Sequence, residues 1–275
     1  MKLISFFYLI LIASLALSAC GAQVEHTTDF PLEIKDAKGI LMRLVPAGEF
    51  TMGSDADDDN RNGYHRVYLE AFYMDMYEVT NARYAACVEA GVCDPPQSEN
   101  TDFRPKYYGN PEFDEFPVVY VDWKMARTFC ETWRGARLPT EAEWEKAARG
   151  TDERTYPWGE VISCDLANFD GIPNYDSYCV GETSEVGMYE SGKSPFGLYD
   201  MAGNVFEWTS SLNKPYPYLA TDGREDLMSA GDRVIRGGSW NEDANDLQVY
   251  YRSWIGINLA ESELGFRCAS AVLSQ

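Results

Sequence analysis

The chain has little histidine and few basic residues, and both shortages limit what the protein can do. His26 and His65 are its two histidines, one in a polar segment near the N-terminus and one at the start of an expected strand. A two-histidine iron site therefore cannot be built on the domain that follows this segment. Lysine and arginine total 23 against 44 aspartate and glutamate, a net charge of −21. We expect no nucleic-acid partner, because this surface repels phosphate.

Long hydrophobic runs are also scarce: the sequence has one, near the N-terminus. Residues 1–19 carry one lysine and then an apolar run, which is the layout of a secretory signal peptide. The run ends in Leu17-Ser-Ala-Cys20, which looks like a bacterial lipobox and implies cleavage before Cys20 and lipid on that cysteine. An uncleaved anchor, or an ordinary signal that leaves Cys20 unmodified, is the alternative. No later run is long enough to span a bilayer, so we expect membrane contact through the N-terminal lipid.

This N-terminus predicts the organisation and location of the protein. We expect a signal peptide over 1–19, a lipidated cysteine and tether over 20–34, and one domain over 35–275. Gly21 follows Cys20, where some lipoproteins retained in the inner membrane carry aspartate. The expected location is therefore the cell envelope, at the outer membrane or cell surface rather than the inner membrane.

Six cysteines remain once Cys20 is assigned to lipid, and an even number in an exported protein predicts three disulfides. Six cysteines allow fifteen pairings. Two pairs are close in sequence, and the third is then left over. The expected bridges are Cys87 with Cys93, Cys164 with Cys179, and Cys130 with Cys268.

Local patterns predict a mixture of short helices and strands. A hairpin is expected around the turn Pro46-Ala-Gly48, and closing strands over 233–240 and 265–272. Three helices are expected, and the clearest follows Thr140, which with Glu143 has the spacing of a capping box. The segment from 150 to 178 is mostly turn.

The stretch 196–209 places two carboxylates among glycines and large aromatic residues. Glu207 lies between Phe206 and Trp208, and a buried carboxylate is costly without a cation or several hydrogen bonds. Calcium could be the cation, with Asp200 as a second oxygen ligand, or an arginine could pair with Glu207 in the core. Oxygens in the segment 168–178 could likewise bind metal or form ordinary Asx turns.

Several motifs together resemble the formylglycine-generating enzyme family, also called sulfatase-modifying factors, over about residues 35–272. They are Glu78-Val-Thr-Asn81, Arg137-Leu-Pro-Thr-Glu-Ala-Glu-Trp144, Tyr156-Pro-Trp-Gly159, the run from Gly197 to Trp208, Arg236-Gly-Gly-Ser-Trp240 and Gly265-Phe-Arg-Cys268. The resemblance implies an α+β fold, a disulfide-stabilised variant of the C-type lectin fold with little regular secondary structure.

The resemblance also implies structural calcium. One calcium would be held at Asp200, Gly203, Val205 and Glu207, with Gly203 and Val205 contributing backbone carbonyls, and a second at Asn168, Phe169, Asp176 and Tyr178. The pair Cys130 and Cys268 matches a family disulfide. A second family bridge is expected to be absent, because Ala148 and roughly Trp254 take its place.

The chemistry that the resemblance implies is missing from the sequence. Family enzymes oxidise a cysteine of a sulfatase to formylglycine with O2. They use two copper-binding cysteines in the segment after Gly-Gly-Ser. Glu242 and Leu247 stand at those two positions. Neither provides the soft thiolate that Cu(I) needs, so we expect neither copper nor iron. Ser239 has no base beside it in the sequence, which favours a turn hydroxyl over a nucleophile.

The sequence therefore predicts a lipid-anchored envelope protein whose domain binds a peptide, a glycan or an envelope partner without catalysis. The expected groove consists of Ser239, Trp240, Asn241, Glu242, Tyr250, Tyr251 and Arg252. Core packing is the alternative for the two tyrosines. The alternative functions are an oxidoreductase that converts a target cysteine to formylglycine, and a purely structural role in the envelope.

Overall fold

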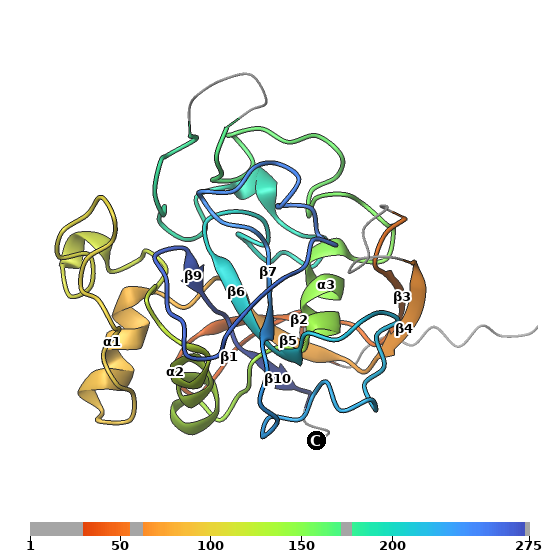
Figure 1. Ribbon diagram of the computed structural model, residues 1–275, viewed down its shortest axis with the longest axis horizontal. Coiled ribbons are helices and arrows are strands. Elements are labelled where there is room, and N and C mark those ends of the chain that lie inside the picture. Colours follow the sequence, from red (N-terminus) through yellow and green to blue (C-terminus); the bar gives the residue numbers. More distant parts are fainter. Residues whose placement is uncertain (1–29, 56–62, 172–177, 273–275) are drawn as a thin grey trace, which may run out of the picture.

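The computed structural model describes residues 30–55, 63–171 and 178–272. The predicted signal peptide and Cys20 lie outside these residues, as does Asp176. Short sheets form the centre and the right of the domain in Figure 1, helices lie on both sides of the central strands, and long loops cover the top. The low content of regular secondary structure agrees with the predicted α+β fold.

The first sheet joins the two ends of the domain. Its order is β1 (Glu33–Lys35), β2 (Leu41–Val45), β5 (Phe72–Asp75) and β10 (Ala269–Ala271), all antiparallel. The predicted hairpin is β2 followed by β3 (Gly48–Met52), but β3 pairs with β4 (His65–Leu69) in a separate two-stranded sheet. The N-terminal strands are therefore divided between two sheets.

The third sheet carries the centre of the fold. Its order is β8 (Ser253–Ile255), β7 (Arg233–Arg236), β6 (Phe206–Leu212) and β9 (Leu264–Gly265). Every residue of β6 is buried, which explains the apolar residues on both sides of Glu207. Glu207 pairs in register with Arg236 on β7 and with Gly265 on the parallel strand β9.

Helices pack beside and between these sheets. They are α1 (Asn81–Glu89), η1 (Pro111–Phe113), α2 (Trp123–Thr128), the π-helical turn η2 (Phe129–Trp133), α3 (Glu141–Arg149) and η3 (Glu190–Gly192). The capping box of α3 is confirmed: the Glu143 amide donates to Thr140 Oγ1 at 3.1 Å, and the Thr140 amide donates to Glu143 Oε2 at 2.9 Å. No described helix is long and apolar enough to cross a membrane.

All three predicted disulfides are present. The Cα atoms are 5.4 Å apart for Cys87 and Cys93, 5.7 Å for Cys130 and Cys268, and 5.2 Å for Cys164 and Cys179. The bridge from Cys130 to Cys268 ties η2 to the segment before β10, inside a core cluster that includes Trp208 and Phe266. It therefore fixes the helical side of the domain to its last strand.

Candidate functional site

Glu207 has an arginine partner in the core. Both Glu207 oxygens accept hydrogen bonds from Arg267, each at 2.7 Å, and Oε2 also accepts one from Trp144 Nε1 at 2.9 Å. Glu207 and Arg267 are fully buried. Of the two partners that the sequence left open, the structure contains the arginine. In this arrangement Arg267 offsets the buried charge of Glu207 without a metal ion.

Asp200 and Glu78 add two further carboxyls beside this pair. Glu78 Oε2 accepts a hydrogen bond from Asn204 Nδ2 at 2.7 Å, and Asp200 Oδ2 accepts one from the Gly187 amide at 2.7 Å. Burial, and then the charges of Asp200 and Glu207, raise the pKa of Glu78 well above its usual value. Burial raises the pKa of Asp200 to about 6. Among the described residues, no group of three or more Asp, Glu, His or Cys side chains is arranged to hold a metal ion.

Gly203 and Val205, the other two predicted ligands of this site, would contribute backbone carbonyls, and both lie in closely packed surroundings. A Cβ at Gly203 would lie 2.2 Å from the carbonyl oxygen of Asn168, so glycine allows the two segments to touch. The Asn204 amide donates to the same carbonyl at 2.8 Å. The side chain of Val205 is fully buried. The segments of the two predicted calcium sites therefore lie side by side.

The second predicted site contains buried oxygens without partners. Asn168 Nδ2 donates to the Glu182 carbonyl at 2.7 Å, and the other side-chain atom, Oδ1, is buried without a hydrogen bond. Neither carboxylate oxygen of Glu182 accepts a hydrogen bond, and Arg104 Nε is 3.5 Å from Oε2. Buried polar atoms are normally satisfied, so these oxygens fit a hard cation such as calcium. The Phe169 carbonyl accepts a hydrogen bond from the Cys179 amide at 3.0 Å.

Glu182 is absent from the predicted ligand set. The predicted set also contains Asp176, which lies outside the described residues, and Tyr178, whose side chain is 48% exposed and which could contribute only its backbone carbonyl. The available signal was an acidic residue just after Cys179, between Gly181 and Thr183. Asn168 remains a candidate ligand, and its side chain is hydrogen-bonded to the backbone of Glu182.

The two positions that would hold the copper-binding thiols differ in their surroundings. Leu247 is fully buried in a cluster with Phe169 and Tyr156, so it fills space in the core. Glu242 lines a cavity of about 180 Å³ together with Glu261, Glu263, Trp254 and apolar residues of the third sheet. The six cysteines of the described domain are all in disulfides, so this part of the chain provides no free thiol.

The cavity at Glu242 is strongly acidic. Burial, and then the neighbouring carboxyl of Asp246, raise the pKa of Glu242 to about 7. Burial and the charge of Glu263 raise the pKa of Glu261. No basic side chain is among the residues that line this cavity. The cavity therefore favours a cation, and the exposed ring of Trp254 adds an aromatic wall.

An aromatic cluster lies next to this cavity along the chain. Trp240 is nearly buried and meets the rings of Phe103 and Tyr178, at centroid distances of 6.1 and 6.0 Å. Phe103 is 70% exposed. Ser239 Oγ donates to Glu263 Oε2 at 2.8 Å and accepts from the Asn241 amide at 3.2 Å, the bonding of a turn hydroxyl.

The prediction that residues 250–252 line an open groove is not supported by their surroundings. Arg252 is buried, where it forms an ion pair with Glu141 and lies over the ring of Tyr216. The ring of Tyr250 lies over Arg149, and Tyr251 packs against the main core cluster. Arg252 therefore lies in the interior and not in a groove, and the half-buried Tyr250 and Tyr251 fit the packing alternative. In the first half of the predicted groove, Asn241 is exposed and Glu242 is half-buried, whereas Ser239 and Trp240 are buried.

Comparison with known proteins identifies the family. The model of the sulfatase-modifying factor enzyme 1-like domain matches residues 33–272. The "Inactive C-alpha-formylglycine-generating enzyme 2" of Bos taurus is 32% identical, over 87% of this chain and 91% of that protein. The "Serine/threonine-protein kinase pkn1" of Chlamydia caviae is 32% identical over 84% of this chain, which spans 38% of that relative's length.

A solved structure supports the same assignment. The structure of PvdO from Pseudomonas aeruginosa superposes with a TM-score of 0.67 at 25% identity, covering 87% of this chain and 98% of that one. The fold is thus the expected formylglycine-generating-enzyme variant of the C-type lectin fold. The chain belongs to the family of the sulfatase-modifying factor enzyme 1-like domain.

Proposed function

We propose that this protein is a lipid-anchored envelope protein whose domain binds a basic peptide segment and catalyses no oxidation. The observation that carries this proposal is the acidic cavity at Glu242. Glu242 stands at the position where the family enzymes have one of their two copper-binding cysteines. Three glutamates and an aromatic ring around about 180 Å³ suit a lysine or arginine side chain. The exposed ring of Phe103, beside Trp240, offers apolar contact to neighbouring residues of such a peptide.

Peptides of different charge test this proposal. Calorimetric titration should show that an oligolysine peptide binds and that matched oligoserine and oligoglutamate peptides do not. Glu242→Gln should weaken oligolysine binding, whereas Glu49→Gln, an equal charge change at an exposed residue of β3, should not. Equal binding of oligolysine by both variants would contradict the assignment of the cavity.

The catalytic alternative is tested separately. A cysteine-containing sulfatase peptide is incubated with the protein, copper and oxygen, and oxygen uptake is recorded. We expect no uptake above a copper-only blank, because the cysteines of the described domain are all in disulfides. Uptake with formation of an aldehyde on the peptide would show that the domain is an enzyme.

We further propose that a structural calcium ion binds at the buried oxygens of Asn168 and Glu182, with the Phe169 carbonyl as a further ligand. An ion that binds the folded state at 100 times its Kd contributes about 2.7 kcal/mol. EDTA should therefore lower the unfolding temperature by roughly 5–10 °C, and excess calcium should restore it.

Two variants decide whether this site is responsible. Glu182→Gln should remove the response to EDTA, because it removes the anionic ligand. Glu185→Gln, an exposed residue three positions later, should keep it. If EDTA has no effect on the native protein, the calcium proposal is wrong. If both variants respond equally, the ion binds elsewhere.

A further inference from the structure

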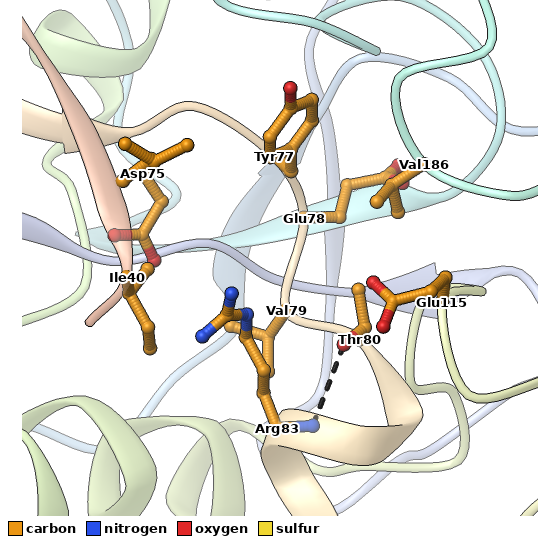
Figure 2. A pocket seen from close by; sticks show the side chains of 10 residues that line it. Ile40, Asp75, Tyr77, Glu78, Val79, Thr80, Arg83, Glu115 and Val186 are labelled. Carbon is orange, nitrogen blue, oxygen red and sulfur yellow. Dashed lines mark hydrogen bonds between the residues drawn. The ribbon is translucent and has the colours of Figure 1, made fainter. Parts of the chain in front are cut away.

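Buried oxygens without hydrogen-bond partners indicate a shared ligand only where they belong to segments that lie together. A cavity of about 230 Å³ at the N-terminal end of α1 has Asp75 and Glu78 in its walls, each with one such oxygen. Figure 2 shows the two carboxyls on opposite sides of the segment between them, so one ligand cannot meet both. The free oxygens of Asn168 and Glu182, by contrast, belong to two segments that a disulfide joins.

The disulfide between Cys164 and Cys179 holds these two segments side by side. Asn168 follows Cys164 by four residues, and Glu182 follows Cys179 by three. Two hydrogen bonds join the same segments. The Cys179 amide donates to the Phe169 carbonyl at 3.0 Å, and Asn168 Nδ2 donates to the Glu182 carbonyl at 2.7 Å. The disulfide is therefore a covalent link that keeps Asn168 beside Glu182.

This disulfide is also the most accessible of the three in the described domain. Cys164 and Cys179 are both half-buried, whereas each of the other four cysteines is at most 7% exposed. Reduction of a disulfide begins with attack of a thiolate on one of its sulfur atoms, so access favours it. The bridge that supports the oxygens of Asn168 and Glu182 is thus the one that a thiol reagent reaches most easily.

We propose that the disulfide between Cys164 and Cys179 is a redox-sensitive element that controls calcium binding at Asn168 and Glu182, an inference that rests on the calcium site proposed above. Its reduction needs a dithiol. One thiolate of the dithiol attacks a sulfur atom of the bridge, and the other sulfur leaves as a cysteine thiol. The second thiol of the reagent then displaces the first cysteine, so the protein gains two thiols and the reagent becomes a cyclic disulfide.

Reduction should weaken calcium binding because the chain between the two cysteines no longer forms a covalently closed loop. The hydrogen bonds between the two segments remain possible, but keeping Asn168 beside Glu182 then costs more conformational entropy. The effect is reciprocal. Calcium that binds the oxidised protein more tightly than the reduced protein must also protect the bridge from reduction.

Thiol labelling of the native protein tests the reactivity of the bridge. The protein is treated with dithiothreitol and then with iodoacetamide, and the labelled peptides are measured by mass spectrometry over time. Cys164 and Cys179 should be labelled at least about tenfold faster than the four buried cysteines, and excess calcium should slow their labelling. Labelling of all six cysteines at one rate, or of another pair first, would overturn the proposal.

Calcium titrations of matched double variants test the link to the metal site. Cys164→Ser with Cys179→Ser should lower the calcium affinity at least about tenfold, as loss of a supporting contact commonly does at metal sites. Cys87→Ser with Cys93→Ser removes a bridge beside α1 and should leave the affinity unchanged. The unfolding temperature without calcium shows whether each variant is folded.

The titrations separate the role of the disulfide from the calcium site itself. A native protein that binds no calcium contradicts both proposals. A native protein that binds calcium, with equal affinity in the variant without Cys164 and Cys179, overturns the role of the disulfide and leaves the calcium site standing. If that variant does not fold, the native protein reduced and alkylated at these two cysteines replaces it in the same titration.

Discussion

Buried arginine side chains, each paired with a glutamate, stabilise the centre of this domain. Arg267 pairs with Glu207, Arg236 with Glu145, and Arg252 with Glu141. In each pair, both side chains are buried. Removing one partner of such a pair leaves an uncompensated buried charge, which costs about 3–5 kcal/mol.

Arg267→Met should therefore lower the free energy of unfolding by about 3–5 kcal/mol. Glu207 would lose both hydrogen bonds from the guanidinium and keep the one from Trp144. Urea denaturation measures the change. Arg127→Met is the control, because Arg127 forms a partly exposed i,i+4 pair with Glu131 that contributes at most about 1 kcal/mol. Equal losses in both variants would contradict the role given to burial.

Leu247 provides a second test at the same scale. It is fully buried where the family has a thiol, and it lies close to Gly203 and Gly238, which have no side chain in the way. Leu247→Ala should lower the free energy of unfolding by about 2–5 kcal/mol, since it leaves a cavity. A loss below about 1 kcal/mol in urea denaturation would show that this position is not a packed part of the core.

Single residues were predictable from the sequence only where their partners are local. The aromatic neighbours of Glu207 indicated burial, but nothing nearby in the chain identified Arg267, which is sixty residues away. The burial of Arg252 is likewise not predictable from its neighbours in the chain, because its partner Glu141 lies on a helix more than 100 residues earlier. Glu182 and Glu263 were missed for the same reason: their importance follows from tertiary contacts.

At the scale of elements, capping and turn residues predicted where helices and strands lie better than where the strands end. The α3 helix begins directly after its N-cap, Thr140, and ends before Gly150 as predicted. The strand predicted over 233–240 ends at Arg236, because Gly237 and Gly238 adopt φ values of +99° and +71°. A Cβ at Gly238 would lie 2.7 Å from Leu247. The close approach of another segment, invisible in the sequence, ends the strand.

The contact between the segments around 168 and 203 depends on glycine. Gly203→Ala should lower the free energy of unfolding by at least about 2 kcal/mol, because it adds a clash with the Asn168 carbonyl to the strain of φ +79°. Gly39→Ala separates the two effects: its φ is +77°, but its Cβ would meet nothing within 4 Å. Chemical denaturation of both variants measures the difference, and equal losses would rule out the clash.

At the scale of the whole molecule, the fold class was predicted because motifs of the family are spread over the entire domain. The N-terminal anchor remains a prediction. Mass spectrometry of the native N-terminus should show a chain that begins at Cys20 and carries acyl groups. Cys20→Ser should lose the acyl mass and keep residues 1–19, because it removes both the site of lipid attachment and the cysteine before which cleavage is expected. A native protein that keeps residues 1–19, or a Cys20 without acyl mass, would contradict the predicted anchor.

The pH dependence of peptide binding tests the central claim, that an acidic cavity has replaced a catalytic thiol, most directly. The pKa of Glu242 is about 7, so its carboxyl gains negative charge as the pH rises from 6 to 8, while lysine keeps its positive charge. Asp243, Asp246 and Glu263 surround it and contribute to the raised pKa.

We expect calorimetric titration to show that the affinity for oligolysine rises about tenfold across this range, a change of about 1.4 kcal/mol. Glu242→Gln should bind more weakly at pH 8 and lose this rise. An affinity that is constant or falls with pH in the native protein, or a rise that persists in Glu242→Gln, would contradict the account.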